Sequence, residues 1–296
     1  MLRNIPTILT STAALLLAAA VAACSPLGVL NTLTPAAGYI ATADIAYGPD
    51  PRETLDVYQP SPQAVSQTPR AGYPVVVFFY GGTWVSGDRR DYKFIGEALA
   101  AQGIVTVVAD YRLYPQVRYP DFLADCARAV AWAQREAAKY GGDARRLYVM
   151  GHSSGAYNAA MLALDPHYLA NAGVPAGTIK AAALLSGPYD FYPFTEQRGR
   201  DALGQWPRPA ETQPINFVTR SAPPMLLATG SADDIVMPRN SQALAAKLAA
   251  AGVPVELKIY PGKGHVDLAK SLSRPFRGTT PALTDSAAFL HRVLGS

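Results

Sequence analysis

The chain contains little that could cross-link it or hold a metal. Its 296 residues include two cysteines and four histidines, and these are not gathered at the spacings typical of metal ligands. We therefore expect neither a metal nor an organic cofactor. Cys126 falls in an amphipathic stretch predicted to be helical, where it is expected to be a small buried apolar residue.

The chain also lacks runs of basic residues. Its formal net charge is +4 and its pI is about 9.0, but lysine and arginine are scattered, which argues against a nucleic-acid partner. Hydrophobic residues make up 49% of the chain. That content, over this length, favours one large domain with a substantial core.

The amino terminus has the pattern of an export signal. Arg3 precedes a short apolar stretch that ends in "LLLAAAVAAC" at Cys24, and this stretch is shorter than the roughly 20 residues needed to span a bilayer. Residues 21–24 resemble the bacterial lipobox, in which the cysteine is lipidated. The alternative is an ordinary signal peptide cleaved nearby, with Cys24 incidental. With Cys24 acylated, no intramolecular disulfide can form.

The resemblance to a lipoprotein implies three segments. Residues 1–23 would be the signal peptide, 24–41 a lipid-anchored linker, and 42–296 the folded domain. The mature protein would be exported and anchored in a membrane, facing the periplasm or the exterior. Ser25 follows the cysteine where aspartate would favour the inner membrane, so the outer membrane is favoured.

Strand-like and helix-like patterns alternate through the folded domain. Continuously apolar stretches are typical of parallel strands covered on both faces, and the first two strands alternate like antiparallel edge strands. The pattern predicts an α/β fold with a mixed, mainly parallel eight-stranded sheet and flanking helices. Strands are expected over 42–48, 54–60, 73–80, 104–111, 146–151, 181–187, 224–230 and 255–262, and helices over 91–102, 121–140, from 154, 240–251 and 282–294. Residues 187–222 are rich in proline and aromatics and predict a small cap insertion.

A glycine-flanked pair of serines lies between a predicted strand and a predicted helix. "GHSSG", residues 151–155, fits G-x-S-x-G, which places the central serine on a sharp turn with its hydroxyl exposed. Ser153 is therefore the candidate nucleophile, and the backbone N–H of Ser154 a candidate oxyanion donor. We expect Ser154→Ala to cost little. Taken alone, the motif is equally compatible with a tight strand-to-helix connection.

A second motif, "YGGTW" at residues 80–84, follows the most hydrophobic predicted strand. It resembles the HGGG-type loop of esterases, with Tyr80 in place of His and Thr83 in place of the third Gly. The backbone N–H groups of Gly81 and Gly82 are candidate oxyanion donors. Asp110 and Arg112, in a similar "DYRL" stretch, are expected to form structural pairs behind this loop.

A base and an acid follow in the order that the elbow motif requires. Among the histidines, only His265 follows a predicted terminal strand in a glycine-rich loop, and His152 is expected to point away from the nucleophile. "SADDIVMP" after the penultimate strand offers Asp233 and Asp234. We favour Asp233 because it stands three residues before Val236, and Asp234 remains the alternative. The order Ser153, Asp233, His265 is the α/β-hydrolase order.

Together these motifs resemble the α/β-hydrolase carboxylesterases related to hormone-sensitive lipase and kynurenine formamidase, including feruloyl esterase-like and prenylcysteine methylesterase-like members. The resemblance runs from Asp44 to the carboxyl terminus and implies a serine esterase acting on short-chain or aromatic small-molecule esters. Trp84, Tyr189 and Phe191 are candidate pocket residues, with ordinary packing as the alternative.

Three other functions stay open at this point. An amidase or formamidase, or an acyltransferase, could use the same three residues. A non-catalytic lipoprotein that binds ligands on a hydrolase fold is the third alternative, and the joint presence of the three residues and the glycine loop argues against it. The sequence does not indicate an oligomeric state.

Overall fold

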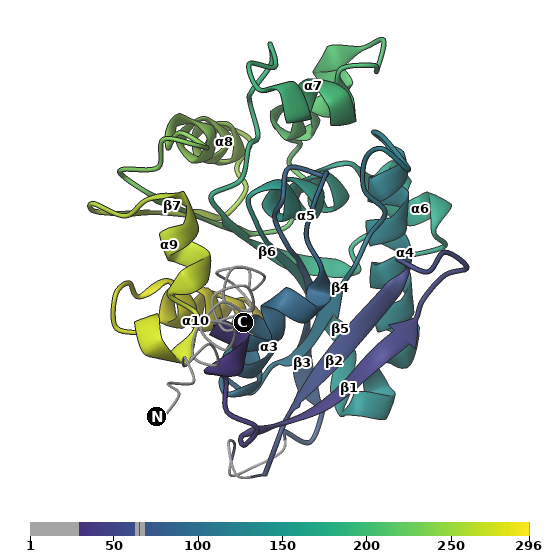
Figure 1. Cartoon of the computed structure of the whole chain (residues 1–296), viewed down its shortest axis with the longest axis vertical. Coiled ribbons are helices and arrows are strands. Elements are labelled where there is room, and N and C mark those ends of the chain that lie inside the picture. The colour runs from purple at the N-terminus through teal and green to yellow at the C-terminus, as the bar shows by residue number, and fades with distance from the viewer. Residues whose placement is uncertain (1–29, 63–64, 66–68, 296) are drawn as a thin grey trace, which may run out of the picture.

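A single eight-stranded sheet runs through the protein, which we describe from a computed structural model over residues 30–62, 65 and 69–295 (Figure 1). The strand order is β1-β2-β4-β3-β5-β6-β7-β8. β2 pairs antiparallel with β1 and β4, and the other neighbours are parallel, so the predicted fold class is confirmed. The strands are β1 (Tyr39–Ala46), β2 (Thr54–Pro60), β3 (Tyr73–Phe79), β4 (Val105–Ala109), β5 (Gly142–His152), β6 (Ile179–Leu185), β7 (Met225–Gly230) and β8 (Val255–Tyr260).

Helices cover both faces of this sheet. α3 and α10 pack together on one face, and α4, α5 and α6 pack together on the other (Figure 1). Every residue of β3 and β4 is buried, as expected of parallel strands with two covered faces. The helices are α3 (Lys93–Ala100), α4 (Asp121–Glu136), α5 (Ser154–Leu164), α6 (Pro166–Asn171), α7 (Gln197–Leu203), α8 (Arg239–Ala250), α9 (His265–Lys270) and α10 (Ala282–Gly295).

Three short helices were not expected from the sequence. α6, α7 and α9 have six or seven residues each, which is less than two turns and too short to show a helical period. The helix expected over 121–140 is regular only to Glu136 and continues as a 3₁₀ turn to Tyr140. Over the described part of the chain, no helix is both long and apolar enough to cross a membrane.

The insertion between β6 and β7 forms a small cap that contains α7, which lies at the top of the molecule in Figure 1. Hydrogen bonds tie it to the body. The Tyr157 hydroxyl, on α5, donates to the carbonyl of Thr212 at 2.9 Å. The Tyr119 hydroxyl donates to the carbonyl of Glu211 at 2.6 Å. The cap is therefore fixed over the helix that follows Ser153.

The folded body begins earlier than the sequence suggested. β1 starts at Tyr39 rather than at residue 42, and Leu30 is already buried in the core. The side-chain oxygen of Asn31 accepts a hydrogen bond from the Phe94 N–H at 3.3 Å. Part of the predicted linker thus belongs to the domain, held by isolated side chains that leave no periodic pattern. The predicted signal peptide and Cys24 lie outside the described residues.

Candidate active site

Ser153 occupies a sharp turn between β5 and α5. Its φ of 56° and ψ of −125° are strained for a residue with a side chain. The flanking glycines are required by close backbone approach: a Cβ at Gly155 would lie 2.0 Å from the Phe79 carbonyl oxygen, and one at Gly151 would lie 2.3 Å from that of Gly155. The local geometry is that of a nucleophile elbow.

The structure brings the three candidate catalytic residues together. The Ser153 Oγ lies 2.9 Å from His265 Nε2, and His265 Nδ1 lies 2.9 Å from Asp233 Oδ2. A carboxylate can only accept, so Nδ1 carries the proton and Nε2 accepts from the serine hydroxyl. His265 is thereby in the tautomer that a general base requires.

Asp233 follows β7 and is held by the loop that it begins. Its Oδ1 accepts hydrogen bonds from the N–H groups of Ile235 and Val236 at 3.2 and 2.9 Å. Burial raises the pKa of Asp233, but the hydrogen bond and charge of His265 outweigh this and keep the pKa below its ordinary value. The neighbouring Asp234 is exposed, so Asp233 is the carboxylate that pairs with the histidine.

The sequence predicted that His265 lies in a loop. In the structure it is instead the first residue of α9. The Gly264 N–H donates to Asp267 Oδ2 at 2.9 Å, which starts the helix directly after the glycine. His265 is 8% exposed. The helix therefore restricts the backbone of the candidate base while leaving Nε2 beside Ser153.

His152, before the nucleophile, has a partner that sequence reasoning missed. Its Nε2 donates to the backbone carbonyl of His265 at 3.0 Å, and the two ring centres lie 4.9 Å apart. Burial and the nearby His265 lower the pKa of His152 to about 4. A neutral imidazole thus holds the backbone of the candidate base.

The candidate oxyanion loop crosses directly over Ser153. A Cβ at Gly81 would lie 2.9 Å from the Ser153 Cβ, which explains the need for glycine. Gly81, Gly82 and Ser154 remain the predicted oxyanion donors.

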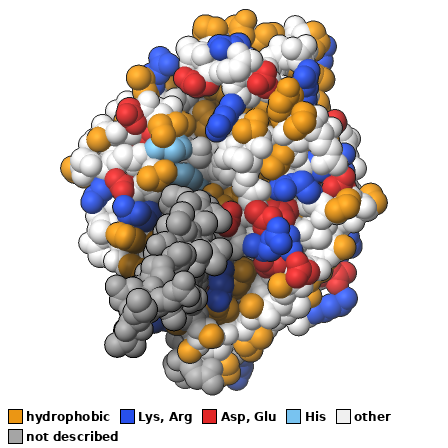
Figure 2. Space-filling view, viewed as in Figure 1, with side chains coloured by type: hydrophobic (Ala, Val, Ile, Leu, Met, Phe, Trp, Pro, Cys, Tyr) orange, Lys and Arg blue, Asp and Glu red, His pale blue; other side chains and the backbone are white. Residues whose placement is uncertain are grey.

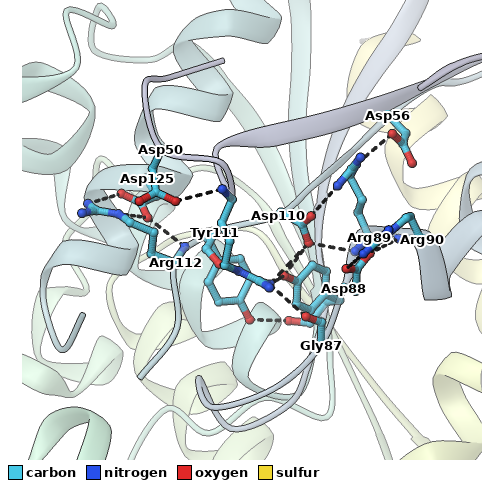
Figure 3. Close-up of polar contacts among 12 residues, drawn as sticks. Asp50, Asp56, Gly87, Asp88, Arg89, Arg90, Asp110, Tyr111, Arg112 and Asp125 are labelled. Atoms are coloured by element: carbon cyan, nitrogen blue, oxygen red, sulfur yellow. Dashed lines mark hydrogen bonds and ion pairs between the residues drawn. The ribbon is translucent and has the colours of Figure 1, made fainter. Parts of the chain in front are cut away.

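Charged residues hold Tyr80, the first residue of this loop, and connect it with Arg89, which follows the loop (Figure 3). The Tyr80 hydroxyl donates to Asp110 Oδ1 at 2.7 Å and accepts from Arg52 Nη2 at 2.7 Å. Arg89 donates through Nη1 to Asp110 Oδ2 at 2.6 Å and through Nε to Asp56 Oδ1 at 2.8 Å. Tyr80, which stands in place of the histidine of an HGGG-type loop, therefore serves as a member of this ion-pair network.

Asp110 lies behind the loop as expected, but Arg112 lies elsewhere. Arg112 forms a bidentate pair with Asp125 of α4, at 2.9 and 2.7 Å (Figure 3). Asp125 also binds Arg128. Arg112 therefore fixes the following segment to α4 and does not contact the loop network.

Of the three candidate pocket residues, only Phe191 keeps more than marginal exposure. Tyr189 is fully buried and Trp84 is 2% exposed. The Trp84 ring stacks on Phe191 with centres 6.2 Å apart and meets Tyr157 edge-on at 5.0 Å. The Tyr189 N–H donates to Asn240 Oδ1 at 3.0 Å and its side chain is fully buried, which favours ordinary packing, the alternative to a pocket role.

Comparison with known proteins identifies relatives with esterase names. The chain is 33% identical to esterase LipC of Mycobacterium tuberculosis over 77% of its own length and 60% of that protein. It is 30% identical to the probable isoprenylcysteine α-carbonyl methylesterase ICMEL2 of Arabidopsis thaliana, over 81% and 60%. The chain thus spans about 60% of the length of these relatives.

Solved structures support the fold. Esterase B of Lactobacillus rhamnosis superposes with a TM-score of 0.75 at 20% identity, covering 95% of both chains. Esterase 2 of Thermogutta terrifontis superposes with a TM-score of 0.70 at 24% identity, covering 88% of this chain and 96% of the other.

Among the described residues, no group of three or more His, Cys, Asp or Glu side chains could hold a metal ion.

A family model settles the assignment. The model described as BD-FAE matches residues 55–248, which is more than half of the chain and includes the elbow, the glycine loop and Asp233. The resemblance to α/β-hydrolase esterases is thereby confirmed, and the chain belongs to the BD-FAE family of α/β-hydrolases.

Proposed function

We propose that the protein is a serine carboxylesterase in which Ser153, His265 and Asp233 are the catalytic triad. The observation that carries the proposal is the continuous hydrogen-bonded chain from Ser153 Oγ through His265 to Asp233, with 2.9 Å at each step. The esterase names of the relatives and the family membership support the same reaction.

The mechanism follows from the proton positions. His265 Nε2 takes the hydroxyl proton while Ser153 Oγ attacks the ester carbonyl carbon. The N–H groups of Gly81, Gly82 and Ser154 stabilise the oxyanion. The imidazolium, stabilised by ionised Asp233, then protonates the leaving alkoxide, and the acyl group stays on Ser153. A water molecule activated by the same imidazole releases the acid.

Aromatic packing beside the glycine loop bears on the size of the acyl group. Trp84, in the glycine loop, is packed between Phe122, Tyr157 and Phe191 and is 2% exposed. An aromatic wall fixed in this way restricts the space beside the loop. We therefore propose short-chain or aromatic esters as substrates.

The proposal is tested by active-site labelling and turnover. The full-length protein should react with a fluorophosphonate probe and hydrolyse p-nitrophenyl acetate and butyrate, and Ser153→Ala should abolish both. A panel of octanoyl, feruloyl and formamide substrates then ranks the acyl groups. Undiminished hydrolysis by Ser153→Ala would show that another residue is the nucleophile.

Membrane attachment through Cys24 is a separate part of the proposal and rests on the sequence of residues 21–24. Lipidation predicts that the wild-type protein incorporates labelled palmitate and sediments with outer membranes, whereas Cys24→Ser does neither. Equal fractionation of both forms would favour an ordinary signal peptide.

A further inference from the structure

The glycine loop holds three successive residues in the left-handed region of φ. The values are 134° at Gly82, 56° at Thr83 and 60° at Trp84. For a residue with a side chain this conformation is strained, and it persists only where neighbouring groups enforce it. The loop over Ser153 is therefore dependent on its contacts.

Two of the enforcing contacts come from one face of α5. The Thr83 N–H donates to the Ser154 Oγ at 3.0 Å, and the Trp84 Nε1–H donates to the Asn158 Oδ1 at 3.0 Å. Positions 154 and 158 are one helical turn apart and thus face the same way. Ser154 is 2% exposed and Asn158 is fully buried.

The first residue of the loop is held by a different side chain. The Tyr111 hydroxyl donates to the carbonyl of Tyr80 at 2.8 Å, whereas Ser154 accepts from the Thr83 N–H. The loop is thus held on both sides of Gly81 and Gly82.

We propose that Ser154 and Asn158 are positioning residues that set the oxyanion loop relative to the nucleophile. α5 begins directly after Ser153 and also supplies the two side chains that hold the loop. The same helix therefore sets the positions of both the Ser153 Oγ and the loop amides. Preorganised amides stabilise an oxyanion most effectively when they do not need to move. This inference rests on the proposed esterase function and assigns Ser154 a side-chain role that the sequence did not suggest.

Ser154→Ala is the direct test, because alanine suits a helix and removes only the hydroxyl. We expect kcat for p-nitrophenyl acetate to fall by about tenfold or more with KM nearly unchanged, since the lost contact acts on the transition state. The Ki of an aryl boronic acid, which mimics the tetrahedral intermediate, should rise by a similar factor. Asn158→Leu, which removes the acceptor of Trp84, should change kcat and Ki in the same direction.

A matched control is Ser286→Ala, which removes another fully buried serine hydroxyl, on α10. This variant should keep wild-type kcat and Ki. If Ser154→Ala lowers only the melting temperature and leaves kcat and Ki unchanged, its role is structural and the inference is overturned. Lack of turnover and of probe labelling in the wild-type protein would instead overturn the esterase function itself.

Discussion

The imidazole of His152 donates its Nε2–H to the backbone carbonyl of His265 at 3.0 Å. His152, which directly precedes the nucleophile, therefore holds the backbone of His265, the proposed general base. Since a carbonyl oxygen can only accept, this bond requires the proton on Nε2 of His152. The ring is 6% exposed, so a charge on it would be poorly solvated.

This buried histidine makes the free energy of unfolding depend on pH. The pKa of His152 is lowered from 6.5 to about 4 in the folded protein, so between these values the unfolded chain binds the additional proton. The contribution of His152 to the free energy of unfolding is therefore fully present above about pH 6.5. It is lost as the pH falls towards 4, by up to about 3 kcal/mol.

Urea unfolding at pH 7, 6, 5 and 4.5 checks this prediction against His152→Gln, whose side-chain amide can still donate a hydrogen bond but does not titrate. The wild-type protein should lose more stability than the variant as the pH falls. Parallel curves for the two proteins would show that His152 titrates alike in the folded and unfolded states.

The two adjacent aspartates after β7 should differ strongly in their effect on turnover. Asp233→Asn leaves the shape of the side chain but removes the charge that holds the Nδ1 proton of His265, so kcat/KM should fall by about 10³-fold or more. Asp234→Asn is the matched control, because Asp234 is exposed, and it should keep wild-type activity. The reverse result would show that Asp234, and not Asp233, is the acid of the triad.

Local spacing and chain order made much of the site predictable. The glycines around Ser153 are dictated by backbone approach, and Val236 donates its N–H to Asp233 from the position that the sequence motif fixes. The sheet was predictable for a similar reason, since its central strands are continuously apolar.

What the sequence left undetermined depends on side chains that meet across distant segments. His152 and His265 are 113 residues apart in the chain, and Thr83 and Ser154 are 71 apart. No local sequence pattern predicts either hydrogen bond. Asn158 did leave a signal, because it is a lone amide in an otherwise apolar stretch of α5, one turn after Ser154. The burial of Tyr189 could not be inferred because the cap has no regular periodicity.

Gly81→Ala should impair catalysis through a direct collision. The added Cβ would lie 2.9 Å from the Ser153 Cβ and 3.1 Å from the His152 carbonyl oxygen, so the loop must shift away from the nucleophile. A displacement of this kind can cost about 10²-fold in rate, measured as kcat/KM. Gly278→Ala, where nothing lies within 4 Å of the added Cβ, should be neutral. Equal activity of the two variants would show that the loop can yield at no cost.

Arg89 and Arg90 are adjacent, yet their replacement by alanine should differ in its effect on stability. Arg89 is 5% exposed and is hydrogen-bonded to Asp56 and Asp110, both buried. Asp110 also pairs with Arg52, but among the described ion pairs Asp56 has Arg89 alone, so removal of Arg89 leaves a buried carboxylate uncompensated and should cost about 3–5 kcal/mol. Arg90 is exposed and pairs only with Asp88 among the described ion pairs, so its removal should cost less than about 1 kcal/mol. Urea unfolding midpoints compare the two variants.

Arg89 follows the oxyanion loop and binds the same Asp110 as Tyr80, so Arg89→Ala should also lower kcat. A stable and fully active Arg89→Ala would show that the loop is held without this network.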